Sequence, residues 1–91
     1  MSQKEKLLEK VRRAPGNVRW NQVLKLMAAW GFVMKPTEEG AAFLHPTLAT
    51  EALIVLVPKP HRDKVKQPYV RQCLKAIDLL LEKEEKENEK S

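Results

Sequence analysis

The segment Lys64–Leu81 constrains the fold of this 91-residue chain more strongly than any other. Apolar residues recur in it at spacings of three and four, which is the pattern of a helix with one packed face. These residues are Val70, Cys73, Leu74, Ile77, Leu80 and Leu81. Pro68 suits a first helical turn, because the amide hydrogen that proline lacks has no partner there. The pattern predicts an amphipathic helix that begins near Pro68.

Positive charge is concentrated at the start of this predicted helix. Residues 59–75 contain six basic residues and one acidic residue, a local net charge of +5 that equals the net charge of the whole chain. Cations at a helix start oppose the helix dipole, so local stability does not explain them, whereas an anionic partner does. We expect a phosphate-binding surface, and the alternative is a solvated basic face. The candidate residues are Lys59, His61, Arg62, Lys64, Lys66, Tyr69, Arg71 and Lys75.

Length and composition predict one small globular domain. The chain is 32% charged and 43% hydrophobic, and no apolar run approaches the roughly 20 residues that span a membrane. The first ten residues lack the apolar core of a signal peptide, and Cys73 is the single cysteine, so we expect a cytoplasmic protein without disulfides or membrane contact. The net positive charge favours nucleic acid or an acidic protein as the partner.

The remaining patterns predict the order of the other elements. We expect a short helix over 3–13, a helix over Trp20–Trp30, strands over 32–35, 41–45 and 52–57, and a loop over 46–50. Gly31 suits the residue after a helix, where φ is positive. Residues 1–16 form an N-terminal helical segment, 17–82 the domain and 83–91 a charged tail. The order is typical of an α+β two-layer sandwich with both main helices on one face of an antiparallel sheet, as in double-stranded-RNA-binding domains.

The third predicted strand, Ala52–Val57, is apolar on both faces, because successive residues of a strand point to opposite sides. One face carries Leu53, Val55 and Val57, and the other carries Ile54 and Leu56. The face turned away from the helices needs a cover, since exposed aliphatic side chains forgo roughly 1.5–3 kcal/mol each. The candidates are the N-terminal helix with Leu7, Leu8 and Val11, a second copy of the chain, and a protein partner. We expect the N-terminal helix.

Few side chains are suited to catalysis. His45 ends a predicted strand and His61 lies among the basic residues, and their spacing indicates neither a pair nor a metal site. Cys73 lies on the packed stripe, where cysteine is usually a small core residue and not a nucleophile. The sequence has no glycine-rich phosphate loop. We therefore expect neither a metal nor a cofactor.

Several motifs resemble the HicA toxin family of bacterial toxin–antitoxin systems. They are Asn17-Val18-Arg19-Trp20, Phe43-Leu44-His45-Pro46 and, most specifically, KQPYVRQCLKAID at 66–78. The resemblance covers residues 4–82 and implies a double-stranded-RNA-binding-like fold. It also implies a stress-response endoribonuclease that cleaves mRNA without the ribosome and is neutralised by a HicB antitoxin bound over the active site. The basic residues of 59–75, with His61 and Tyr69, would then be its RNA-binding surface.

The chain departs from the family where the resemblance places the catalytic residue, a His in a Gly-Ser-His motif. Glu38-Glu39-Gly40 occupies this motif, and one deleted residue would move the His position to Ala41. Neither glycine nor alanine can transfer a proton, and losing such a group typically costs about 10²–10⁴-fold in rate. Three interpretations stay open: an inactive member that keeps the basic surface, a role for His45 or His61 instead, and a deliberate change of His to Ala.

An alternative function belongs to a different class. The chain would be a catalytically inactive protein-interaction module that binds an acidic HicB-like partner with the same basic surface and never meets RNA. A homodimer is compatible with either function.

Overall fold

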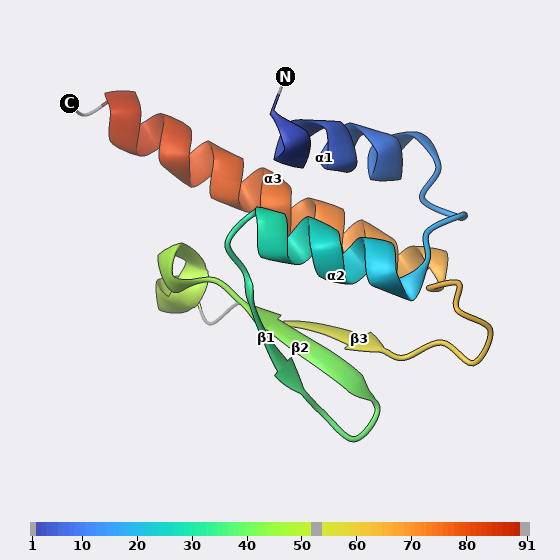
Figure 1. The fold of residues 1–91 in the computed structure, drawn as a ribbon. Coiled ribbons are helices and arrows are strands. Elements are labelled where there is room, and N and C mark those ends of the chain that lie inside the picture. The colour runs from blue at the N-terminus through green and yellow to red at the C-terminus, as the bar shows by residue number, and fades with distance from the viewer. Residues whose placement is uncertain (1, 52–53, 90–91) are drawn as a thin grey trace.

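The protein was analysed as a computed structural model, which describes residues 2–51 and 54–89. Its elements are α1 (Gln3–Arg13), α2 (Trp20–Ala29), β1 (Val33–Pro36), β2 (Gly40–Leu44), the short 3-10 helix η1 (Pro46–Glu51), β3 (Val55–Pro58) and α3 (Gln67–Glu89). The helices α2 and α3 cover one face of the sheet, and α1 lies on the side of these helices away from it (Figure 1). The prediction of an α+β protein is confirmed. Among the described helices, none is long and apolar enough to cross a membrane.

The three strands pair antiparallel in the order β1-β2-β3. Phe43 of β2 lies opposite Val55, and Ala41 lies opposite Val57, and all four are buried. Leu56, between the two inward residues of β3, is exposed. This alternation is the one predicted for the apolar strand, with Val55 and Val57 facing the helices. Residues 52 and 53 of the predicted strand lie outside the described residues.

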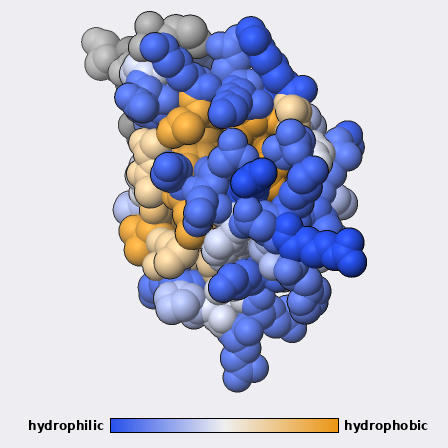
Figure 2. All heavy atoms as spheres, turned by 45° about the vertical axis from the view of Figure 1, so that its right-hand side comes forward, coloured by the Kyte–Doolittle hydropathy of each residue, from blue (hydrophilic) through white to orange (hydrophobic). Residues whose placement is uncertain are grey.

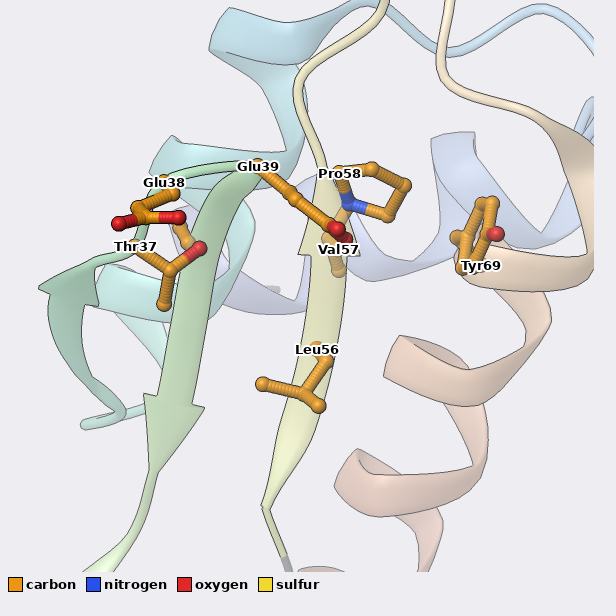
Figure 3. Close-up of a pocket in the computed structure, with 8 residues that line it drawn as sticks. Thr37, Glu38, Glu39, Leu56, Val57, Pro58 and Tyr69 are labelled. Carbon is orange, nitrogen blue, oxygen red and sulfur yellow. The ribbon is translucent and has the colours of Figure 1, made fainter.

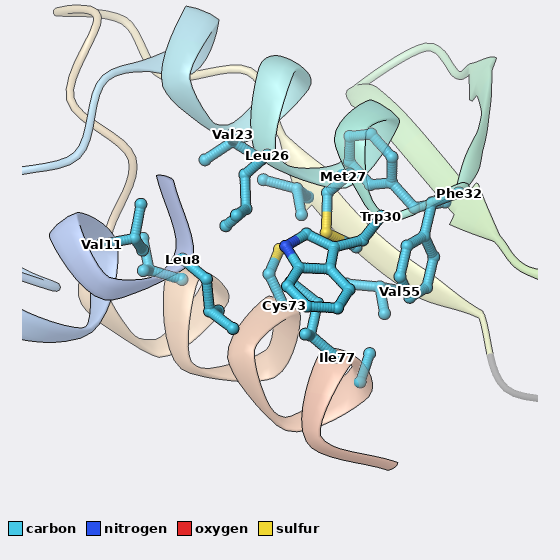
Figure 4. Packing of buried hydrophobic residues seen from close by; sticks show 14 of the residues in the cluster. Leu8, Val11, Val23, Leu26, Met27, Trp30, Phe32, Val55, Cys73 and Ile77 are labelled. Carbon is cyan, nitrogen blue, oxygen red and sulfur yellow. The ribbon is translucent and has the colours of Figure 1, made fainter. Parts of the chain in front are cut away.

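The core lies between the sheet and the helices and continues up to α1 (Figure 4). It contains Leu26 and Met27 of α2 and Val70 and Ile77 of α3, all fully buried, together with Phe43 of β2. The predicted stripe of α3 is largely buried, with Leu74 and Leu81 packed at its margin. Helical spacing therefore identified the packed face of this helix correctly.

The predicted role of the N-terminal helix as a cover for the sheet is wrong. Leu8 and Val11 of α1 are buried against α2 and α3, not against the strands. The indole Nε1 of Trp30 donates a hydrogen bond to the Lys4 carbonyl oxygen at 3.1 Å, and the Lys4 ammonium lies 4.6 Å from the centre of the Trp30 ring. The helix α1 docks here because the layer of α2 and α3 has a second apolar side, which includes Trp30.

The outer face of the sheet is consequently open. Val33, Ile54 and Leu56 are 52%, 52% and 58% exposed. Val33 lies in β1, Leu56 in β3 and Ile54 just before β3. Together these three exposed aliphatic side chains form an apolar patch on the outer face of the sheet.

The segment 46–51 differs from its prediction, and α3 is longer than predicted. The predicted loop 46–50 lies within η1, whose Leu48 is fully buried and donates its N–H to the His45 carbonyl oxygen at 3.0 Å. The helix α3 begins at Gln67 and continues through the charged segment to Glu89, because glutamate and lysine are good helix formers. Gly31 has a φ of 84°, as predicted for the residue that follows the second helix.

Candidate nucleic-acid interface

The basic loop, residues 59–66, joins β3 to α3 and is tied to the start of α2. The Trp20 N–H donates to the Asp63 carbonyl oxygen at 2.8 Å, and the Val65 N–H donates to the Val18 carbonyl oxygen at 2.8 Å. Between these bonds, Arg19 and Lys64 form an antiparallel bridge. Val18 and Val65 are both buried, so the loop is held from inside while its charged side chains remain outside.

A basic pocket of about 360 Å³ opens on this loop. Its lining is Pro58, Lys59, Pro60, His61, Arg62, Lys64, Lys66 and Tyr69. Six of the eight residues expected from the sequence therefore line one pocket. Arg71 and Lys75 do not line it, and they are exposed farther along α3.

Within the described residues, the Lys and Arg side chains of the basic pocket take part in no ion pair. In the described part of the chain, the ion pairs are Arg12 with Asp78 and Arg13 with Glu9, both remote from the pocket in sequence. Figure 2 brings the side with the basic loop forward and shows mostly hydrophilic side chains around a smaller apolar area. Four unpaired Lys and Arg side chains in one pocket produce a positive potential that attracts an anion.

The apolar part of the basic pocket consists of rings. Tyr69 lies in the first turn of α3 and is half-buried, and its N–H donates to the Lys66 carbonyl oxygen at 3.0 Å. Pro58 and Pro60 provide the other rings. Aromatic rings beside basic groups are the combination that binds an unstacked base and its phosphate.

A second pocket, the hairpin pocket, adjoins the first and has a volume of about 460 Å³ (Figure 3). Its lining is Thr37, Glu38, Glu39, Ala41, Leu56, Val57, Pro58 and Tyr69. Pro58 and Tyr69 belong to both pockets, so an acidic hairpin tip stands directly beside the basic loop. Sequence reasoning did not identify Glu38 and Glu39 as site residues. The signal would have been the antiparallel pairing of β2 with β3, which places Gly40 opposite Pro58.

Gly40, where the resemblance places the catalytic His, has no room for a side chain. A Cβ added to Gly40 would lie 2.5 Å from Lys59 N and 2.8 Å from the Pro58 carbonyl carbon, and closer still to the Val57 carbonyl oxygen. All three are backbone atoms, so an imidazole at this position requires β3 to move. The other aligned position, Ala41, is 1% exposed and faces the core.

The two histidines lie in different surroundings. His45 follows β2 at the end of the sheet away from the basic loop (Figure 1). Its Nδ1 accepts a hydrogen bond from the Thr47 N–H at 3.1 Å, and its ring packs edge-on against Phe32 with 5.1 Å between ring centres. His45 therefore stabilises the start of η1. His61 is exposed and lines the basic pocket.

Cys73 belongs to the core, as predicted. Its side chain is buried, and burial raises the pKa of the thiol from 9.0 to about 12. The thiol stays protonated at neutral pH, so Cys73 is not a nucleophile. Among the described residues, no group of three or more His, Cys, Asp or Glu side chains is arranged to hold a metal ion.

Comparisons of the chain with protein-family models, with curated proteins and with solved structures find no match.

Proposed function

We propose that this chain is a HicA-like RNA-binding protein of a toxin–antitoxin type system, and that its basic pocket binds the RNA backbone. The observation that supports this most directly is the basic pocket itself, in which four cations without an ion pair among the described residues line the same pocket as the Tyr69 ring. A positive charge alone would attract any polyanion. The addition of an aromatic ring favours nucleic acid, because a base can stack where its phosphate is bound.

The proposed ligand is single-stranded RNA. Stacking on Tyr69 requires a base that is free of its own helix, and a pocket of about 360 Å³ has the size of a site for one nucleotide-sized group. The phosphates would be held by Lys59, Arg62, Lys64 and Lys66 of the pocket, with Arg71 and Lys75 extending the basic surface along α3.

We further propose that RNA cleavage is far slower than in a family member with an intact Gly-Ser-His motif. Attack by the 2′-hydroxyl needs one group that accepts its proton and another that protonates the leaving oxygen. Gly40 and Ala41 provide neither. Any remaining activity would belong to His61, which lines the basic pocket, and not to His45, whose Nδ1 is engaged with Thr47.

A salt titration tests the proposed RNA binding. The affinity for a single-stranded RNA should fall steeply with salt, and Lys64→Gln/Lys66→Gln should flatten the slope of log K against log salt by about 0.7 for each charge removed. The matched control is Lys6→Gln/Lys25→Gln, which removes the same charge from exposed positions on α1 and α2. Fluorescence anisotropy of a labelled RNA measures both slopes. Equal slopes for the two double variants would remove the basic loop from the interface.

A protein partner is the second candidate function, favoured by the exposed aliphatic side chains Val33, Ile54 and Leu56. In this alternative an acidic HicB-like protein occupies the basic surface, and the open sheet face gives it an apolar contact. Absence of RNA binding by the wild-type chain, together with its co-purification with an acidic protein encoded beside it, would favour this function over the first.

A further inference from the structure

We propose that the hairpin pocket is a binding site for a guanine base, placed beside the phosphate-binding basic pocket. This inference depends on the proposed RNA-binding function and adds the base that the protein prefers. The inference is based on the position and chemistry of Glu39, a carboxylate that has no role in binding phosphate.

The hairpin pocket and the basic pocket are positioned to hold neighbouring parts of one nucleotide. They share Pro58 and Tyr69, and the volume of about 460 Å³ lies in the range of small-molecule sites. The Glu39 side chain extends toward Val57 and Pro58, on the side where Tyr69 lies, whereas the Glu38 carboxylate points the other way (Figure 3). Glu39 is therefore the carboxylate aimed into the pocket.

The Glu39 backbone is fixed while its carboxylate is free. The Lys59 N–H donates to the Glu39 carbonyl oxygen at 2.7 Å, which joins the hairpin tip to the end of β3. Within the described residues, the Glu39 carboxylate takes part in no ion pair or hydrogen bond, including none with Lys59 across the strands. An unpartnered carboxylate on a fixed backbone is ready to accept hydrogen bonds from a ligand.

The chemistry of a carboxylate selects guanine among the four bases. An ionised carboxylate only accepts hydrogen bonds, and its two oxygens match two parallel donors. Guanine presents two adjacent donors on its Watson–Crick edge, the N1–H and the exocyclic amine. Adenine and cytosine present one amine beside an acceptor nitrogen, and uracil presents one N–H between two carbonyl oxygens. The acceptor atoms of these three bases would face the negative charge of Glu39.

The remaining lining of the hairpin pocket suits the flat face of a base. Leu56, Pro58 and Tyr69 supply apolar surface on which a purine can pack. The base itself carries no charge, so Glu39 does not oppose it as it would oppose a phosphate. The phosphate would lie on the other side of Tyr69, among the cations of the basic pocket.

Binding of RNAs that differ in one base tests the guanine site. We expect the 91-residue chain to bind a uridine oligomer with one central guanosine about tenfold more tightly than the same oligomer with adenosine or cytidine, as charge-assisted hydrogen bonds predict. Inosine, which keeps the N1–H but lacks the exocyclic amine, should give an intermediate affinity. Glu39→Gln should abolish the preference without reducing the salt slope. Glu5→Gln, a change of the same charge at an exposed position of α1 outside both pockets, should keep the preference.

The outcomes separate the two proposals. Equal affinity of the wild-type protein for all the oligomers, or an unchanged preference in Glu39→Gln, would overturn the guanine site and leave RNA binding intact. Failure of the wild-type protein to bind any of these RNAs would overturn both. Because the Glu39 side chain is exposed and has no partner within the described residues, the variant should fold normally, which circular dichroism and a urea midpoint equal to wild type would verify.

Discussion

At Gly40 the hairpin and β3 approach so closely that there is space for the hydrogen of glycine but not for the Cβ of any other residue. The Gly40 N–H donates to Thr37 Oγ1 at 3.0 Å, and its carbonyl oxygen accepts from the Thr37 N–H at 3.0 Å, so the residue also closes the turn. The close approach of β3 requires the glycine, since any other residue would offer the same backbone hydrogen bonds but would add a Cβ. The packing of this hairpin therefore leaves no room for the His that the resemblance to HicA toxins would place here.

Substitution of Gly40 should destabilise the protein. We expect Gly40→Ala to lower the free energy of unfolding by about 1–3 kcal/mol, because the added Cβ meets backbone atoms that cannot rotate away. Gly16→Ala is the control, since the nearest atom to a Cβ there is the Gln67 Oε1 at 3.8 Å. Urea unfolding measures both. An unchanged midpoint for Gly40→Ala would mean that β3 yields easily and that the position has room for a catalytic side chain.

At the scale of elements, α1 is an integral part of the core. An isolated helix of 11 residues is marginal in water, so its stability comes from packing. Leu8 and Val11 supply that packing, and the bond from Trp30 to the Lys4 carbonyl oxygen fixes the first turn. The ion pair of Arg12 with Asp78 joins α1 to α3, but it is exposed and should add little.

Truncation of Leu8 tests the docking of α1. Leu8→Ala should cost about 2–5 kcal/mol of unfolding free energy, as expected for a buried leucine. Lys6→Ala, an exposed change on the same helix, should stay within about 0.5 kcal/mol of wild type. Chemical denaturation followed by tryptophan fluorescence gives both values. Equal midpoints for the two variants would show that α1 is detached in solution.

At the scale of the whole molecule, helices cover one face of the sheet and leave the other face open to solvent. The inward residues of β2 and β3 are buried under α2 and α3, while the outer face exposes about half of Val33 and Ile54. Exposed apolar patches of this kind mark contact surfaces for other molecules or promote self-association. Leu56 of this patch also lines the hairpin pocket, whereas Val33 and Ile54 line neither the hairpin pocket nor the basic pocket, so these two residues can be altered separately from the basic surface.

Polar substitution of the outer face should change its surface properties and not its stability. We expect the native protein to bind a hydrophobic dye and to self-associate as its concentration rises. Val33→Thr/Ile54→Thr should reduce both while the urea midpoint stays near that of wild type, because these side chains are already half in water. Val55→Thr, on the inner face, should instead lower the midpoint. Unchanged dye binding in the double variant would place the dye site elsewhere.

The helices and most of the basic pocket followed from the sequence because the signals are local. The three- and four-residue spacing of 70–81 gave the packed face of α3, and Gly31 and Pro58 end α2 and β3 through their own backbone preferences. The predicted residues that line the basic pocket lie within residues 59–69, so one loop and one helical turn bring them together. For such features, short-range geometry is sufficient.

Only the tertiary structure decided the features that depend on distant segments. The short helix η1 forms where the His45 imidazole accepts from the Thr47 N–H and Leu48 finds a place in the core. The helix α1 packs on α2 and α3 and not on the sheet, because Trp30 and its neighbours form a second apolar side of the helical layer. Glu39 and Tyr69 lie thirty positions apart in the chain and line one pocket, because the pairing of β2 with β3 places the hairpin tip beside the end of β3. Strand pairing is a long-range contact whose partners are chosen by the packing of the whole core, and local residue preferences do not encode it.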